Sequence, residues 1–305
     1  PQLVQAQAFP AKPIPFVVPF AAGTATDQIA RAIGNGITAE TKQAVVIDNK
    51  AGASGFIASQ QVAKAAPDGY TVLITTNTTH AANEHLFKKL PYDPVKDFAP
   101  ITALGKGGQI MVVNPSFPAK TVAEFVALAK KEPGKYSFGS GSSSSRMAGE
   151  LLQQMADIKL LHVPYKSNTL AVTDLLGGQI SMMITDTATG LPQVKSGKLR
   201  ALGMSSSNRS PLAPDVPTIA EAGVKGYEMG YWFAAYAPAK TPPAVVKRLN
   251  ELLVKAATSD AAKTAFYEPT GTEVFTTSPE EMAKFQAGES QKWGRIVKAA
   301  GIEAE

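Results

Sequence analysis

Residues 15–31 read PFVVPFAAGTATDQIAR and combine an apolar segment, a loop of small residues and a helical pattern. The apolar residues 16–18 predict a strand, and a helix begins near residue 26, with Asp27 and Arg31 four positions apart on one face. A loop that leads from a strand into a helix presents unpaired backbone N–H groups. Because such groups bind phosphate or carboxylate, we expect an anion site here.

This loop differs from the usual phosphate-binding patterns. It holds a single glycine, Gly23, and contains neither G-x-G-x-x-G nor G-x-x-x-x-G-K-[ST]. A small carboxylate is therefore a better expectation than a nucleotide. The alternative is an ordinary turn between a strand and a helix, in which small residues serve only close packing.

Length and composition narrow the class of protein. The 305 residues suffice for two domains of ordinary size, and 44% hydrophobic with 18% charged residues is typical of a globular protein. The net charge is +5, but the 30 basic residues are dispersed, so we expect no nucleic-acid partner. The absence of cysteine excludes disulfides, thiol catalysis and cysteine-ligated zinc.

The N-terminal residues carry a hint of export. Ala6-Gln7-Ala8 has the small-x-small form of a signal-peptidase site, which predicts a cleaved secretory signal peptide before Phe9. No apolar run in the sequence reaches the roughly 18 residues of a membrane span. A monomer is expected, because no long exposed apolar stripe is evident.

Strand and helix patterns alternate through the first hundred residues. Strands are expected at 14–18, 44–47 and 70–75, and helices at 26–39 and 54–65. This order is typical of a parallel sheet with right-handed crossovers. Ligands of such sheets bind beyond the carboxyl ends of the strands, which singles out the loops after Val18 and Thr75.

A second series begins near residue 101 and predicts a second domain. Further strands are expected at 110–113, 136–138, 162–164 and 180–184, and further helices at 121–131, 146–156, 169–176, 242–257, 259–267 and 279–299. The chain is expected to be irregular after 199–204, and residues 231–236 are aromatic and apolar. Linkers near 101–106 and 225–231 would join domain 1 (1–103 plus 229–305) to domain 2 (104–228). The cleft between such domains is suited to closing on a ligand.

The second strand–loop–helix candidate is the segment 139–145, GSGSSSS. Its hydroxyl and backbone N–H groups are suited to holding an oxyanion at the start of a helix. The alternative is that its serines only cap that helix. Arg146, which follows, would bind a carboxylate in bidentate fashion, unless it points outward as a surface residue.

Three further candidates lie at strand ends. Residues 77–80 (NTTH) offer four polar groups, although His80 is equally suited to capping a helix over 81–87. Asp186 would bind an amine or a hydroxyl, or order water, unless it is a plain turn residue. Trp232 and Phe233 would form the floor of the cleft, although core packing is the commoner role of such residues.

Enzyme motifs are scarce in this sequence. It has no G-x-S-x-G, S-x-x-K or H-E-x-x-H pattern, and its three histidines are His80, His85 and His162. Catalysis by scattered residues stays open as an alternative.

Eight segments, in this order, resemble a single family. They are PFAAGTATDQIAR (19–31), IDNKAGASGFIA (47–58), APDGYTVL (66–73), YDPVKDFAPIT (92–102), HVPYK (162–166), DLLGGQI (174–180), PTIAEAG (217–223) and APAKTPPAVVKRLN (237–250). Over about 14–255 the chain resembles the periplasmic solute-binding proteins of tripartite tricarboxylate transporters, the Bug (TctC-like) family.

The resemblance implies an α/β, two-domain type II periplasmic-binding-protein fold, with a ligand cleft between domains joined by two crossing strands. It implies a periplasmic protein that captures a small carboxylate for the membrane subunits of a transporter, with no catalysis, cofactor or metal. In the family the loop after the first strand grips one carboxylate, largely through backbone amides and ordered water. The ligand-binding residues expected here are Phe20, Ala21, Ala22, Gly23, Thr24, Thr26, Asp27, Asn77, Thr78, Thr79, His80, Ser140, Ser142, Ser143, Ser144, Ser145, Arg146, Asp186 and Trp232.

Two departures from the family pattern bear on the ligand. Thr24 stands where a second glycine is common, and threonine tolerates a positive φ poorly. Arg146 stands where a histidine is common, which predicts a second anionic group and hence a dicarboxylate. Phe20 and Trp232, with their neighbours, favour a bulky or aromatic acid. A carboxylate sensor for a signalling partner and a hydrolase or lyase that uses the serine loop are the alternative functions.

Overall fold

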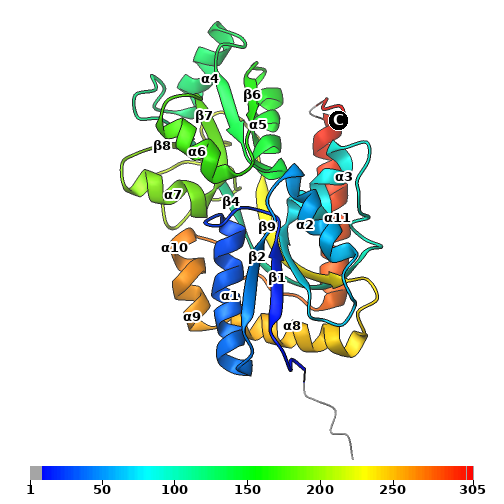
Figure 1. Ribbon diagram of the computed structural model, residues 1–305. Helices are drawn as coiled ribbons and strands as arrows, with labels where there is room; N and C mark the ends of the chain where they lie inside the picture. Colours follow the sequence, from blue (N-terminus) through cyan, green and yellow to red (C-terminus); the bar gives the residue numbers. More distant parts are fainter. Residues whose placement is uncertain (1–8, 300, 305) are drawn as a thin grey trace, which may run out of the picture.

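The computed structural model describes residues 9–299 and 301–304 and has a mixed α/β fold with two lobes (Figure 1). The strands are β1 (Ile14–Val18), β2 (Val45–Asn49), β3 (Val72–Thr76), β4 (Phe98–Val113), β5 (Ser137–Ser140), β6 (Leu161–Pro164), β7 (Met182–Asp186), β8 (Arg200–Met204) and β9 (Gly230–Pro238). The α-helices are α1 (Ala25–Thr41), α2 (Phe56–Ala63), α3 (Asn83–Leu86), α4 (Val122–Lys131), α5 (Ser143–Ala156), α6 (Asn168–Leu176), α7 (Thr187–Lys195), α8 (Pro243–Ala257), α9 (Asp260–Ala262), α10 (Glu268–Thr270) and α11 (Pro279–Ala299). Shorter or wider helical turns are η1 (Ala53–Gly55), η2 (Thr78–Ala82) and η3 (Lys263–Tyr267).

The first lobe contains β1, β2 and β3. β1 lies between β2 and β3 and is parallel to both, while β9 pairs antiparallel with β3. Ile29 and Ile33 of α1 pack with Leu249 and Leu253 of α8 in a core that includes Phe16 of β1. The spacing of four residues within each pair places both side chains on one helix face, which explains why these helices bury that face.

β4 is a 16-residue strand that belongs to both lobes. Its first part pairs antiparallel with β9 from Phe98 to Gly108. Its last five residues, from Gln109, pair antiparallel with β7 in the second lobe. β4 and β9 are therefore the strands that cross between the lobes (Figure 1).

The second lobe contains β5 to β8 and helices α4 to α7. β5 lies between β6 and β7 and is parallel to both, and β8 pairs with β4. Phe138 of β5, Phe125 of α4, Leu152 of α5 and Ile184 of β7 belong to one buried core. The parallel strands β5 and β7 lead directly into α5 and α7, so both helices begin at the edge of the sheet that faces the first lobe.

Most of the expected strands and helices are confirmed to within a few residues. Two expectations were wrong. The strand expected at 110–113 begins at Phe98, because the antiparallel partner β9 extends it across both lobes. The helix expected at 81–87 begins earlier, with the wide turn at Thr78.

Other expectations about the chain's organisation are not settled by the fold. The domain bounds at 103/104 and 228/229 stay a prediction. The signal-peptidase motif at residues 6–8 lies outside the described residues. Among the helices of the described ranges, none is both long and apolar enough to span a bilayer.

Candidate functional site

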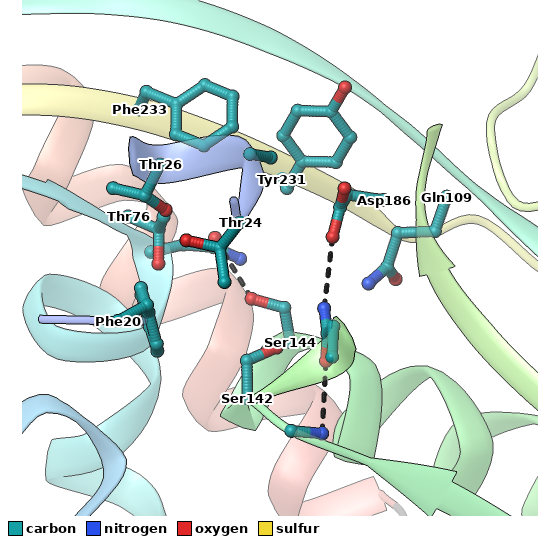
Figure 2. A pocket seen from close by; sticks show the side chains of 14 residues that line it. Phe20, Thr24, Thr26, Thr76, Gln109, Ser142, Ser144, Asp186, Tyr231 and Phe233 are labelled. Atoms are coloured by element: carbon teal, nitrogen blue, oxygen red, sulfur yellow. Dashed lines mark hydrogen bonds between the residues drawn. The ribbon is translucent and has the colours of Figure 1, made fainter. Parts of the chain in front are cut away.

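A cavity lies where both lobes and both crossing strands meet (Figure 2). The first lobe contributes the loop after β1 and the end of β3, and the second lobe contributes the starts of α5, α6 and α7. The residues that line it are Phe20, Thr24, Ala25, Thr26, Thr76, Asn77, Gln109, Gly141, Ser142, Ser144, Asn168, Asp186, Tyr231 and Phe233.

Four helices begin at this cavity. Thr24, Ser142 and Asp186 are the N-caps of α1, α5 and α7, and Asn168 is the first residue of α6. A helix N-terminus carries a partial positive charge that favours an anion. None of the described side chains that line the cavity is basic, so an anion here would depend on backbone N–H groups and hydroxyls.

The loop after β1 is held in shape by a buried carboxylate. Asp27 accepts hydrogen bonds from the Gly23 N–H at 2.9 Å, from Asn49 Nδ2 at 3.1 Å and from Arg31 Nε at 3.0 Å. Burial by itself raises the pKa of Asp27, but the hydrogen bonds from Arg31, Gly23 and Asn49 bring it below its ordinary value. Asp27 is absent from the cavity wall, so its role is to position the loop.

The expected strain at Thr24 is not present. Thr24 has φ −72° and accepts a hydrogen bond from the Asp27 N–H through its side chain, as an ordinary N-cap. The positive φ of the loop, +82°, falls on Gly23 instead. Phe20, Thr24 and Thr26 line the cavity, whereas Ala21, Ala22 and Gly23 do not.

The four consecutive serines of the second loop, residues 142–145, make different contacts. Ser142 and Ser145 form a reciprocal capping box at the start of α5. Ser143 Oγ donates to Asn83 Oδ1 at 2.8 Å, and Ser144 Oγ donates to Asn77 Oδ1 at 3.1 Å. The last two bonds join α5 of the second lobe to the segment after β3 of the first lobe.

Only part of the serine loop faces the cavity. Ser142 and Ser144 line it, and the buried Ser145 does not. The side chains of Ser143 to Ser145 bond residues outside the loop, namely Asn77, Thr78, Asn83 and Asn168, whereas the serine of this loop that contacts a histidine is Ser140.

Asp186 ends β7 and is joined to the serine loop by a chain of hydrogen bonds. Asn168 Nδ2 donates to Asp186 Oδ2 at 3.0 Å, and the Gly141 N–H donates to Asn168 Oδ1 at 3.0 Å (Figure 2). The Thr189 N–H donates to Asp186 Oδ1 at 2.8 Å. Asp186 is the one carboxylate among the described lining residues.

The expectation that Trp232 forms the cavity floor was wrong. Successive side chains of β9 point to opposite faces, and Tyr231 and Phe233 line the cavity while Trp232 does not. Trp232 donates from Nε1 to Glu289 of α11 and packs against Phe285. The alternation of side chains along a strand would have predicted from the sequence that Tyr231 and Phe233 share one face of β9 and that Trp232 lies on the other.

The segment after β3 divides in a similar way. Asn77 lines the cavity, but Thr78 lies behind it, 3.2 Å from Ser144 Oγ. Thr79 bonds the His80 ring at Nδ1, and that ring stacks on Tyr236 with centroids 3.9 Å apart. Burial lowers the pKa of His80 to about 3, so it is a neutral core residue.

Arg146 lies next to the cavity and not in its wall. With Ser140, Ser143, His162 and Lys166 it borders an adjoining space. Three residues border both spaces, namely Phe20, Gly141 and Ser142. The Arg146 side chain is 19% exposed, and its Nε lies 3.9 Å from Glu150 Oε1. Ser140 Oγ lies 2.7 Å from His162 Nε2.

Four lining residues were missed by sequence reasoning, namely Thr76, Gln109, Asn168 and Tyr231, whereas Ala25 and Gly141 lie within the two loops expected to bind and Phe233 was expected at the cleft floor. Gln109 reaches the cavity because β4 pairs with β7, and Asn168 reaches it because α6 begins there. No local sequence pattern predicts either placement. Within the described ranges, no group of three or more His, Asp or Glu side chains is arranged to hold a metal ion.

Comparison with known proteins agrees with this geometry. The family model described as "Tripartite tricarboxylate transporter family receptor" (TctC) matches residues 29–302. The structure of R. palustris Rpa4515 with adipate is 33% identical and has a TM-score of 0.94, with 97% of this chain and 100% of that chain covered.

Two further solved structures are similar. The periplasmic binding protein BugD is 32% identical with a TM-score of 0.92, over 97% of this chain and 100% of that chain. MatC from Rhodopseudomonas palustris with bound malate is 31% identical with a TM-score of 0.89, over 95% and 100%. The chain thus belongs to the tripartite tricarboxylate transporter receptor family and has the two-domain fold of Bug and TctC periplasmic binding proteins.

Proposed function

We propose that the chain is a periplasmic solute-binding protein that captures a small carboxylate and delivers it to the membrane subunits of a tripartite tricarboxylate transporter. The main support for this proposal is that four helices begin at one cavity. None of the described side chains in the wall of this cavity is basic, so the helix N-termini are the groups that favour an anion there. Each helix N-terminus favours an anion by about 0.3–1 kcal/mol, and by up to ~2 kcal/mol when partly buried. The adipate and malate named for two similar proteins are small carboxylates.

The adjoining space supports a ligand with a second carboxylate. Asp186 would repel a second carboxylate inside the cavity, whereas Arg146 and Lys166 border the neighbouring space. Phe20 borders both spaces and offers an apolar surface for the middle of the ligand. The aromatic rings of Tyr231 and Phe233 favour an apolar or aromatic skeleton at the inner end.

Calorimetry on ligand-stripped protein tests carboxylate binding. The probes are aliphatic and aromatic mono-, di- and tricarboxylates, each paired with its neutral amide. A ligand at about 100 times its dissociation constant stabilises the native state by ~2.7 kcal/mol, which a thermal-shift assay detects. We expect a carboxylate to bind without being consumed and its amide to fail. Consumption of the ligand, or equal binding of the amide, would contradict the proposal.

The role of Arg146 is tested by a ratio of affinities. Arg146→Ala should lower the preference for a dicarboxylate over its monocarboxylate analogue by about tenfold, the equivalent of ~1.4 kcal/mol. Arg248→Ala, which changes a half-exposed arginine of α8, is the matched control and should leave the ratio unchanged. An unchanged ratio in Arg146→Ala would remove the argument for a second carboxylate at this place.

Delivery to a transporter is tested in cells. The bound solute should be taken up by cells that express the cognate membrane subunits only when this chain is also present, and the chain should be released with the periplasmic fraction by osmotic shock. Uptake that does not depend on the chain would favour the sensor alternative.

A further inference from the structure

Gln109 and Asp186 are direct neighbours across two strands. They are paired in the antiparallel register of β4 and β7. Directly opposite residues of an antiparallel pair project from the same face, with Cβ atoms about 4.5–5.5 Å apart. Both side chains line the cavity, and Figure 2 shows them side by side at its inner end. The two polar groups therefore face one part of a bound ligand.

The Gln109 side-chain amide is buried without a partner. Gln109 is 1% exposed, and its Oε1 has no hydrogen bond within the described residues. The hydrogen bonds of Gln109 involve its backbone, whose N–H donates to Ser205 Oγ at 2.6 Å. A buried polar group without a partner costs about 1–3 kcal/mol, so such a group in a cavity wall indicates a partner supplied by the ligand.

Asp186 determines which kind of partner fits. Asp186 Oδ2 already accepts from Asn168 Nδ2 and from Thr185 Oγ1, whereas Oδ1 accepts from the Thr189 N–H and remains able to accept again. A ligand carboxylate against Asp186 would place two negative charges side by side in a wall whose described side chains include no cation. A hydrogen-bond donor on the ligand meets no such penalty.

We infer that the ligand carries, in addition to its carboxylate, a hydroxyl or ammonium group that is bound between Gln109 and Asp186. This inference rests on the proposed function and specifies its ligand as a hydroxy- or amino-substituted carboxylate. A hydroxyl donates its single proton to one of the two facing acceptors, Gln109 Oε1 or Asp186 Oδ1. An ammonium donates to Asp186 and to Gln109 Oε1.

Matched ligand series test the inference by calorimetry on the ligand-stripped full chain. The series are propionate, lactate and alanine; succinate, malate and aspartate; glutarate, 2-hydroxyglutarate and glutamate; and phenylacetate, mandelate and phenylglycine. In the series that binds best, we expect one substituted member to bind at least about tenfold more tightly than its unsubstituted parent, because a site with buried polar groups rejects a ligand that leaves them unpaired.

Variants of Gln109 and Asp186 test whether these two residues cause the preference for the substituted ligand. Gln109→Leu should reduce the ratio between substituted ligand and parent to below about threefold. Gln61→Leu, the same change at an exposed position of α2, should keep the wild-type ratio. Asp186→Asn, which keeps a capping oxygen for α7, should also reduce the ratio, so the result does not depend on one variant.

Gln109→Glu separates the two donor groups. A second carboxylate should strengthen binding of the amino member and weaken binding of the hydroxy member.

Two results would overturn the inference alone: a parent acid that binds within about threefold of both of its substituted forms, or a ratio that survives Gln109→Leu. If no carboxylate of any series binds, the proposed function fails as well.

Discussion

The loop after β1 and the loop after β5 both lead from a strand into a helix at the cavity, yet each needs its glycine for a different reason. Gly23 has φ +82°, and a Cβ added to it would meet nothing within 4 Å. Gly141 has no positive φ, but an added Cβ would lie 1.9 Å from the carbonyl carbon of Ser167 and 2.1 Å from the Asn168 nitrogen. The first loop requires a backbone conformation, and the second requires space.

The side chains that hold the two loops also differ. A single buried carboxylate, Asp27, holds the first loop within its own lobe. Hydroxyls hold the second loop, and those of Ser143 and Ser144 bond Asn83 and Asn77 of the other lobe. We infer that the first loop is a preformed anion site and that the second loop depends on how the lobes are placed.

The largest effect is expected for Gly141→Ala. The new methyl group would overlap backbone atoms at the start of α6, so either the loop or α6 must move. We expect unfolding free energy to fall by about 3 kcal/mol, as for severe overpacking, with affinity for the carboxylate reduced by more than ~100-fold. Denaturant unfolding and calorimetry measure both.

The control for Gly141→Ala is Gly288→Ala, in α11. Its added Cβ meets nothing within 4 Å, so helix propensity should make the change neutral or stabilising by up to ~1 kcal/mol. Equal stability of the two variants would show that the close approach of Gly141 to Ser167 does not exclude a side chain at this position.

Asp27→Ala should have the next largest effect. It leaves the Gly23 N–H and Asn49 without their acceptor, which should lower unfolding free energy by about 2–3 kcal/mol. Carboxylate affinity should fall about 30-fold as the loop loses its shape. Asp260→Ala, at a fully exposed carboxylate, should change stability by less than ~0.5 kcal/mol. Unchanged affinity in Asp27→Ala would contradict the preformed site.

Gly23→Ala should cost about 1–2 kcal/mol of stability, because only the left-handed backbone opposes the new side chain. Affinity should fall about tenfold if the loop N–H groups bind the ligand. Gly134→Ala is the matched control. Gly134 has a similar φ of +77° and also has nothing within 4 Å of an added Cβ, but it does not line the cavity. The control variant should cost similar stability and no affinity, and a loss of affinity in both variants would point to a global effect.

The smallest effect is expected for Ser143→Ala. It removes one hydrogen bond, to Asn83, and should lower unfolding free energy by about 1 kcal/mol. Affinity should stay within about threefold, because the Ser143 hydroxyl borders only the adjoining space and already donates its proton to Asn83. Ser196→Ala at an exposed serine is the control. A loss of affinity as large as that of Gly23→Ala would show that the contact between lobes contributes to binding.

The sequence by itself determined the local units of this protein. Apolar runs that end in small or polar residues and continue as amphipathic helices predicted β1 with α1 and β5 with α5, because hydrophobic periodicity and capping act within a few residues. The same local signals identified Phe20, Thr24, Ser142 and Asp186 as candidates that line the cavity. The ordered motifs indicated the family, which the comparisons confirm.

Only the tertiary structure decided which side chains meet. The pleat of β9 directs Tyr231 and Phe233 to the cavity and Trp232 to α11, and the register of β4 on β7 sets Gln109 beside Asp186. Arg146 borders the neighbouring space because it lies one helical turn into α5. These placements depend on pairings such as Leu73 with Tyr236 and Phe98 with Pro238, which join residues more than about a hundred positions apart. Local sequence patterns do not specify contacts over such distances.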